Sequence, residues 1–299
     1  MGHHHNHGHH HTTENIKTAF FLNLAFTIVE IIGGFYTNSL AIMSDAVHDL
    51  GDSLSLGMSW YFQKLSNKGA NKKYSYGYGR FSLLGAIINS IVLIVGSFFI
   101  ISAAIPRIIN PEEADATGMM WLAILGIIVN GAAFFKLKKG SSINERVVSL
   151  HLLEDVLGWF AVFIASIVMQ FWDVPILDPI LSLVIAGYVL FNVYKNIKDA
   201  FKIILQGVPN EISSDEIKKQ IILNIDEVAD IHDCHIWTLD GEFHIATIHV
   251  KIKSKEFSWQ KSKEVKEQIK KLLHDNFNLE HVTLELESIS EDCSYKACN

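Results

Sequence analysis

The sequence predicts a multi-pass α-helical membrane protein with six transmembrane helices, followed by a small cytoplasmic α+β domain. Two observations predict this fold. The 299 residues are 49% hydrophobic and only 19% charged, whereas soluble globular domains contain about 25% charged residues. The apolar residues also gather into stretches of about 17–25 residues, the length that crosses a bilayer as a helix, and this pattern stops near Gly207.

Six apolar segments with few or no charged residues account for the helical part, expected to occupy residues 16–207. The predicted spans cover residues 18–36, 40–62, 81–105, 117–135, 147–172 and 179–194. Uncharged runs of this length would not stay soluble in a bundle exposed to water, so a soluble helical bundle is excluded and the partner of these helices is a lipid bilayer.

Positive charge in the connections predicts the orientation of the bundle. Lysine and arginine are concentrated in the second and fourth connections and after the last span, whereas the other connections are short or acidic. Because these residues stay on the cytoplasmic side, both termini are expected in the cytoplasm, with the protein in the inner or plasma membrane. The polar start of the chain does not have the pattern of a cleavable signal peptide.

Charge and cysteine content exclude other classes of protein. The formal net charge is −7, and the whole acidic excess follows residue 207, which argues against a nucleic-acid partner. Three late cysteines cannot form a disulfide framework. The part after residue 207 has no phosphate-binding loop, and no organic small-molecule substrate is expected.

Residues 208–290 are expected to fold as a small domain of order α-β-β-α-β. Ser213 and Glu216 form a capping box before a helix that ends at residue 225. Two strands, at 228–239 and 242–253, are joined at Asp240-Gly241, a signal for a two-residue hairpin turn. An amphipathic helix at 258–275 and a strand at 281–288 complete a sheet with helices on one face.

Two spans carry the same pair of metal-ligand types at the same spacing, His48-x-x-x-Asp52 and His151-x-x-x-Asp155. Four residues of an α-helix turn by about 400°, so each histidine lies one turn from its aspartate on one face. Two such faces supply two imidazoles and two carboxylates, a tetrahedral set suited to Zn2+, with Co2+ or Cd2+ as alternatives. The competing interpretation is a structural His–Asp pair within each helix.

Further acidic residues share these spans. Glu30, Asp45, Asp49 and Glu154 are expected to hydrogen-bond between helices or to support the ligands, rather than to bind the metal directly. Charged groups inside a membrane are costly, so each one indicates a function.

The residues around these ligands resemble the cation diffusion facilitator family, most closely its zinc/cadmium/cobalt exporter branch. The resemblance covers nearly the whole chain and rests on Ser39-Leu-Ala-Ile-Met-Ser-Asp-Ala-Val-His-Asp-Leu-Gly-Asp52, Tyr76-Gly-Tyr-Gly-Arg80, Ser149-Leu-His-Leu-Leu-Glu-Asp155, Asp178-Pro179 and Ile231-His-Asp-Cys-His-Ile-Trp237. It implies a homodimer with a ferredoxin-like cytoplasmic domain that exports Zn2+ against protons. It also implies a transport site on His48, Asp52, His151 and Asp155, and that His48 favours Zn2+ over Cd2+. Some members have a further metal site in the second connection, but residues 64–80 contain neither Asp nor His, so none is expected here.

The cytoplasmic domain carries a second set of candidate ligands. The predicted hairpin turn places His232 opposite His249, and family members often bind cytoplasmic zinc at positions matching His232 or His235, His249 and Glu287. Because strand residues alternate between faces, His235 is expected to point away from His232. The alternatives are a regulatory or structural Zn2+ ion and ordinary surface histidines.

Both ends of the chain hold potential ligands. Residues 1–15 form a predicted disordered tail with seven histidines in its first eleven residues, which either collects cytosolic metal or is inert. In the C-terminal tail, 291–299, Cys293 and Cys298 either bind Zn2+ or remain free reduced thiols. Cys234 is expected to pack within a strand.

These features favour a secondary transporter that exports Zn2+, with Cd2+ or Co2+ as further cargo, in exchange for protons. An intramembrane zinc hydrolase is the second hypothesis, but four protein ligands leave no coordination position for a reacting water, and the sequence has no His-Glu-x-x-His motif. A metal-sensing receptor, the third, would leave the intramembrane carboxylates unexplained. The protein is therefore expected not to be an enzyme.

Overall fold

The computed structural model describes residues 9–66, 68–137, 143–254 and 258–290. The chain divides into two compact units. The helical unit comprises the chain up to Lys64 together with Leu84–Ile197, and the C-terminal unit comprises Leu65–Leu83 and the chain from Lys198 onward. Each unit has its own buried core.

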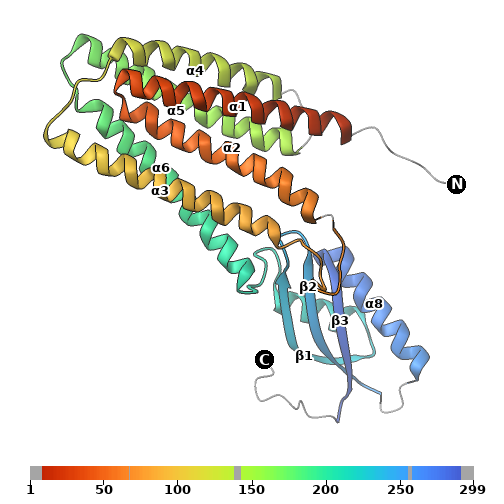
Figure 1. The fold of residues 1–299 in the computed structure, drawn as a ribbon. Helices are drawn as coiled ribbons and strands as arrows, with labels where there is room; N and C mark the ends of the chain where they lie inside the picture. The colour runs from red at the N-terminus through yellow and green to blue at the C-terminus, as the bar shows by residue number, and fades with distance from the viewer. Residues whose placement is uncertain (1–8, 67, 138–142, 255–257, 291–299) are drawn as a thin grey trace. The chain divides into compact units, whose positions relative to one another are not determined.

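Six long helices form the first part of the chain, as the apolar runs predict (Figure 1). They are α1 (His9–Thr37), α2 (Leu40–Ser66), α3 (Phe81–Ile109), α4 (Ala116–Leu137), α5 (Ile143–Phe171) and α6 (Leu177–Ile204). By length and composition, five of these described helices, all except α2, could cross a membrane. Helix α2 has 27 residues and differs in carrying Asp45, Asp49 and Asp52, of which the first two are buried in the helical unit.

Two apolar clusters hold these helices together. Phe26, Ile42, Met119 and Trp159 are buried in a cluster that joins α1, α2, α4 and α5, whereas a smaller cluster joins α3 to α6. Many large apolar side chains on the outer surfaces of the helices are exposed, among them those of Phe35, Phe98, Ile128 and Phe171. Helices with this distribution bury small contact areas against each other and leave their outer faces for lipid.

One buried carboxylate fixes the start of α2. The side chain of Asp178, at the start of α6, accepts hydrogen bonds from Ser39 Oγ (2.6 Å) and from the backbone N–H groups of Leu40 (2.8 Å) and Ala41 (3.2 Å). Ser39 Oγ in turn accepts from the N–H of Ile42 at 3.2 Å. The first N–H groups of a helix have no partner within the helix, so Asp178 satisfies them and joins α6 to α2.

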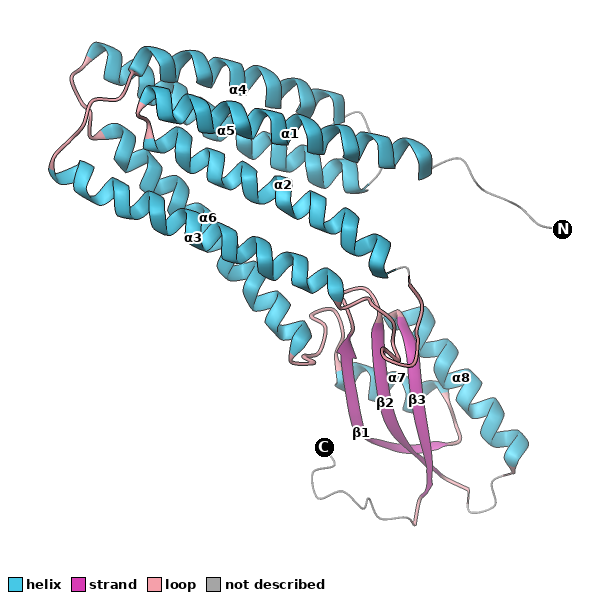
Figure 2. Cartoon of the chain, viewed as in Figure 1, coloured by secondary structure: helices cyan, strands magenta, loops and turns pink. Residues whose placement is uncertain are grey.

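The C-terminal unit has the predicted α-β-β-α-β order (Figure 2). Its elements are α7 (Ser214–Asn224), β1 (Val228–Thr238), β2 (His244–Ile252), α8 (Trp259–Phe277) and β3 (Leu279–Ser288). The sheet has the order β1-β2-β3, with β1 antiparallel and β3 parallel to the central β2. Buried Ile217 and Ile221 of α7 and Ile269 of α8 pack with strand side chains into one core, so both helices cover the same face of the sheet.

The predicted two-residue turn between β1 and β2 is wrong. The chain instead closes through a longer loop, in which the N–H of Leu239 donates to the carbonyl of Phe243 at 2.8 Å and Thr238 pairs with His244. A bulge between His232 and His235 then shifts the register by one residue. The two changes cancel, because the bulge inserts one extra residue into β1, and the predicted pairing of His232 with His249 is confirmed.

The connection between α2 and α3 belongs to the C-terminal unit. A Cβ atom at Gly79 would lie 2.9 Å from Asp240 Oδ2, and Gly77 has a positive φ of 79°. The ring of Tyr76 contacts that of His281 edge-on, with 5.7 Å between centroids. Close approach and left-handed backbone both require glycine, which explains the Tyr76-Gly-Tyr-Gly-Arg80 motif.

We expect Asp178→Ala to lower the free energy of unfolding by about 2 kcal/mol or more, because it leaves the first turn of α2 without acceptors in a buried position. The midpoint of thermal unfolding in detergent measures this effect. Asp173→Ala is the matched control, since Asp173 is an exposed carboxylate a few residues earlier. Equal stability of the two variants would contradict the role given to Asp178.

Candidate metal centres

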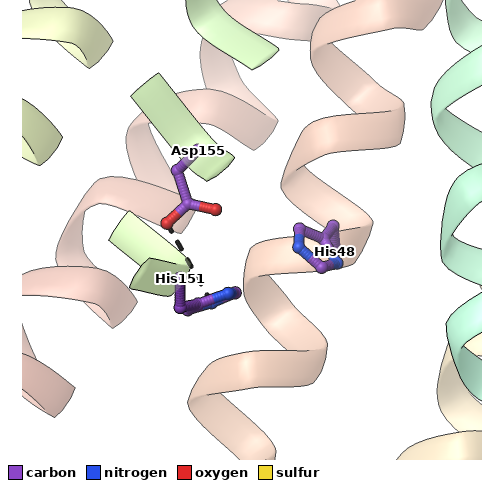
Figure 3. Close-up of side chains that lie close together, drawn as sticks. All are labelled: His48, His151 and Asp155. Atoms are coloured by element: carbon purple, nitrogen blue, oxygen red, sulfur yellow. Dashed lines mark ion pairs between the residues drawn. The ribbon is translucent and has the colours of Figure 1, made fainter. Parts of the chain in front are cut away.

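The four predicted transport ligands lie on α2 and α5, and contacts between their side chains link the two helices. His151 Nε2 of α5 lies 2.9 Å from Asp52 Oδ2 of α2, and His48 Nε2 lies 3.5 Å from the same oxygen. Asp155 Oδ2 lies 4.0 Å from His151 Nε2. Ligand atoms of His48, His151 and Asp155 all lie within 4.8 Å of one another, and Figure 3 shows His48 on α2 beside the His151–Asp155 pair on α5.

This centre is partly buried and has two carboxylates for two imidazoles. The Asp155 side chain is 5% exposed, whereas Asp52 and His48 are 23% and 18% exposed. Glu154 Oε2 lies 4.0 Å from Nδ1 of His151, the nitrogen that is left when Nε2 binds a metal. At this distance Glu154 makes an electrostatic contact with His151 rather than the hydrogen bond that would orient a histidine ligand.

The other intramembrane acids lie outside this group among the described residues. Glu30 of α1 is fully buried, and Asp45 and Asp49 of α2 are 6% and 2% exposed. Asn23 joins α1 to α2 by donating to the backbone carbonyl of Asp49 (3.2 Å) and to Ser53 Oγ (3.1 Å). Polar side chains therefore take part in the contact between α1 and α2.

A second group of ligand types lies on the sheet of the C-terminal unit. Glu287 of β3 contacts both histidines, with 2.6 Å from its Oε1 to His249 Nδ1 and 3.0 Å from its Oε2 to His232 Nε2. The three side chains are 10–13% exposed, and their ligand atoms lie within 4.8 Å of one another. They occupy the face that α7 and α8 do not cover, since Ile248 and Val250, which flank His249, pack into the helix-covered core.

The prediction that His235 points away from His232 is wrong. His235 pairs with Thr247, which lies two residues from His249 and therefore on the same face. The bulge causes this, with Asp233 in the left-handed region at φ 47°. The Asp233 carboxylate lies 3.0 Å from His235 Nε2 and 3.5 Å from His249 Nε2. It therefore links His235 to the group formed by His232, His249 and Glu287.

Sequence reasoning missed Asp233 and Glu285, whose Oε2 lies 3.4 Å from His249 Nε2. An aspartate within a predicted strand was the available signal, because aspartate is rare in strands and tolerates left-handed backbone. Burial raises the pKa of the Cys234 thiol to about 11, which keeps it protonated and unsuited to metal binding near neutral pH. Cys293, Cys298 and residues 1–8 lie outside the described residues.

Family models match almost the whole chain. Residues 16–205 match the cation efflux transmembrane domain, and residues 209–289 match the cytoplasmic domain of cation efflux proteins. The chain belongs to the cation diffusion facilitator family. Members of this family are transporters rather than enzymes. The two matched domains make this protein a multi-pass membrane protein with a cytoplasmic C-terminal domain.

Relatives match along nearly their full length. The cadmium, cobalt and zinc/H(+)-K(+) antiporter of Bacillus velezensis is 33% identical over 296 residues, or 98% of this chain and 94% of that protein. The metal cation efflux system protein CzcD of Cupriavidus metallidurans is 32% identical over 96% of this chain and 90% of its own. The zinc transporter ZitB of Escherichia coli is 30% identical over 96% of this chain and 93% of its own length.

We expect Asp233→Val to destabilise the protein by about 1–2 kcal/mol more than Asp230→Val, because only the first places a β-branched residue in left-handed backbone. Asp230 is an exposed residue of the same strand. Asp233→Gly, which has no such penalty, should unfold near the wild-type temperature. Thermal unfolding of the three variants is the measurement, and an Asp233→Val variant as stable as wild type would argue against the bulge.

Proposed function

We propose that this protein exports Zn2+ from the cytoplasm in exchange for protons, with Cd2+ or Co2+ as further cargo. The observation that carries the proposal is that ligand atoms of His48, His151 and Asp155 lie within 4.8 Å of one another, with Asp52 in contact with both histidines. Relatives named as zinc, cadmium and cobalt antiporters support the choice of cargo.

The donor set suits a divalent ion in transit. Two carboxylates neutralise the charge of the ion, which offsets its loss of water inside the bundle, and two imidazoles favour Zn2+ over harder cations. Each helix supplies one histidine and one aspartate, so a small shift of α2 against α5 would separate the ligands into two incomplete pairs. Such a site can bind tightly in one arrangement and release in the other.

Protons and metal compete for the same nitrogen and oxygen atoms, since Zn2+ requires neutral imidazoles and ionised carboxylates. A proton that binds as the metal leaves also limits the negative charge that returns through the apolar bundle. This competition couples export of the metal to entry of protons. Both termini are proposed to lie in the cytoplasm, with the protein in the inner or plasma membrane.

The C-terminal domain is proposed to have a regulatory role. A transmembrane domain of residues 16–207 would be followed by a cytoplasmic domain of residues 208–290, through which two copies form a homodimer. Three ligands from three strands, those of His232, His249 and Glu287, would hold a regulatory Zn2+ ion, with His235 and Asp233 beside it. The tail at 1–15 is proposed to collect cytosolic metal weakly, whereas Cys293 and Cys298 in the tail at 291–299 either bind Zn2+ or remain free thiols.

Zinc flux in vesicles tests the transport proposal. The purified protein is reconstituted into lipid vesicles, and Zn2+ movement is followed with a fluorescent indicator while a pH gradient is imposed. Movement of Zn2+ against its own gradient, driven by protons and absent from protein-free vesicles, supports exchange. Zinc movement that ignores the pH gradient would contradict it.

We expect Asp52→Asn and Asp155→Asn each to reduce zinc flux by about 100-fold or more, because each leaves the ion only half neutralised in a site with little water. The amide keeps the size of the side chain, so insertion and folding should be preserved. Asp173→Asn, an exposed carboxylate, is the matched control. Wild-type flux in either of the first two variants would exclude that aspartate as a transport ligand.

We expect His249→Ala to weaken zinc binding by the cytoplasmic domain by about 100-fold, because the imidazole contacts Glu287 and lies beside His232. Equilibrium dialysis of the full-length protein in detergent should therefore show fewer zinc ions bound per chain. His274→Ala changes an exposed histidine of α8 and should bind as wild type does. Unchanged binding by His249→Ala would show that these residues are not a zinc site.

A further inference from the structure

Glu30 is a buried acid for which the metal centre supplies no role. Its side chain has no exposed surface, and neither of its carboxylate oxygens has a hydrogen-bond partner among the described residues. An ionised carboxylate without a partner is strongly unfavourable in such a position. The side chain must therefore be neutralised by a bound cation or by a proton.

The surroundings of Glu30 supply no cationic side chain among the described residues. The charged residues that act on it are Asp45 and Asp49 of α2 and Asp155 of α5. Helix α4, which also packs against α1, has no charged residue from Ala116 to Phe135. Negative charge on Asp45 or Asp155 adds to the cost of ionising Glu30, whereas a protonated Asp49 beside it would reduce that cost.

The donor set around Glu30 also argues against a second zinc ion. Glu30, Asp45 and Asp49 offer only oxygen atoms, whereas both groups with metal-ligand geometry in the described chain contain two histidines. Phe26, one turn from Glu30 on α1, packs edge-on against Trp159 with 5.7 Å between ring centroids. This apolar wall disfavours the water molecules that a hard cation retains. A proton needs no such shell.

Glu30 is nevertheless linked to the metal centre. Asp45 is acted on by Asp155, Asp52 and His151 of the centre, and it lies against α5, since its Oδ1 is 3.8 Å from the position of a Cβ at Gly158. Asp45 therefore interacts electrostatically both with Glu30 and with the metal ligands. A divalent ion arriving there adds positive charge, which favours loss of a proton from the adjacent acids, and its departure favours return of the proton.

We infer that Glu30 carries a proton that is exchanged for the transported metal ion. When the metal centre is empty, the Glu30 carboxyl holds a proton taken from the outer side. When Zn2+ binds from the cytoplasm, that proton leaves the carboxyl oxygen and passes to water on the cytoplasmic side. One proton thus enters for each ion that leaves, in addition to those carried by the ligands. The inference rests on the proposed zinc–proton exchange and adds a residue to it that does not touch the metal.

Two transport assays on one reconstituted protein separate this role from a structural one. The first measures uphill zinc transport driven by a pH gradient, and the second measures exchange of zinc isotopes across the membrane at equal pH. Exchange requires the metal site to move but requires no net proton transfer. We expect Glu30→Gln to lose about 100-fold or more of the uphill transport and to keep isotope exchange within about twofold of wild type. Glu113→Gln, an exposed glutamate, should change neither activity.

The outcomes are distinct. Uphill transport by Glu30→Gln at the wild-type rate would overturn the inference and leave the proposed function intact, as would equal losses in both assays. Fewer zinc ions bound per chain in Glu30→Gln would make Glu30 a metal ligand and would also overturn it. Wild-type protein without proton-driven transport would instead refute the proposed function, and the inference with it.

A measurement on wild-type protein, with a conservative variant to assign the signal, makes the test less dependent on how Glu30→Gln folds. Infrared difference spectra should show that a protonated carboxyl band is lost when Zn2+ is added and that Glu30→Asp shifts this band. If zinc binding removes no protonated carboxyl band, the inference is wrong.

Discussion

A bilayer interior offers an ionised side chain neither water nor mobile counter-ions, and this cost decides where the acidic residues of the helical unit lie. The structure meets the cost in three ways. Asp178 accepts hydrogen bonds from the start of α2. Asp52 lies between two histidines. Glu30 has neither a hydrogen-bond donor nor a histidine as partner among the described residues. Its charge must therefore be neutralised by an exchangeable proton or cation. One constraint therefore divides these acids into a structural type, a proposed metal-binding type and a proposed proton-carrying type.

The helices and the proximity of the four proposed transport ligands were predictable because they depend on local periodicity. Apolar runs fix the spans, and a histidine four residues before an aspartate keeps both on one helix face whatever the neighbouring helix does. The sheet depends on turn geometry, which one residue can change. The predicted hairpin turn was wrong, yet His232 still faces His249 because the bulge at Asp233 offsets the longer loop. Alternation could not predict the position of His235, since the bulge interrupts alternation itself.

The two candidate centres differ in charge as well as in place. The proposed intramembrane site has two carboxylates and two imidazoles, so a bound divalent ion would leave no net charge. The cytoplasmic group has one carboxylate and two imidazoles, which leaves a bound ion with a positive charge and a free coordination position. Asp233 and Glu285 lie beside His249 and offset part of that charge in contact with solvent. The first arrangement suits passage through an apolar medium, and the second suits an ion that stays bound and attracts another ligand.

The packing of Gly79 against Asp240 affects how the protein can be divided for experiments. The segment Leu65–Leu83 separates α2 from α3 in sequence but belongs to the C-terminal unit, and its glycine contacts and the Tyr76–His281 ring contact are made there. A chain truncated after α6 would retain this segment without its packing surface, while an isolated C-terminal fragment would expose the surface that the segment covers. Proteolytic or recombinant halves of this molecule are therefore imperfect substitutes for the intact chain, even though their boundary in sequence looks simple.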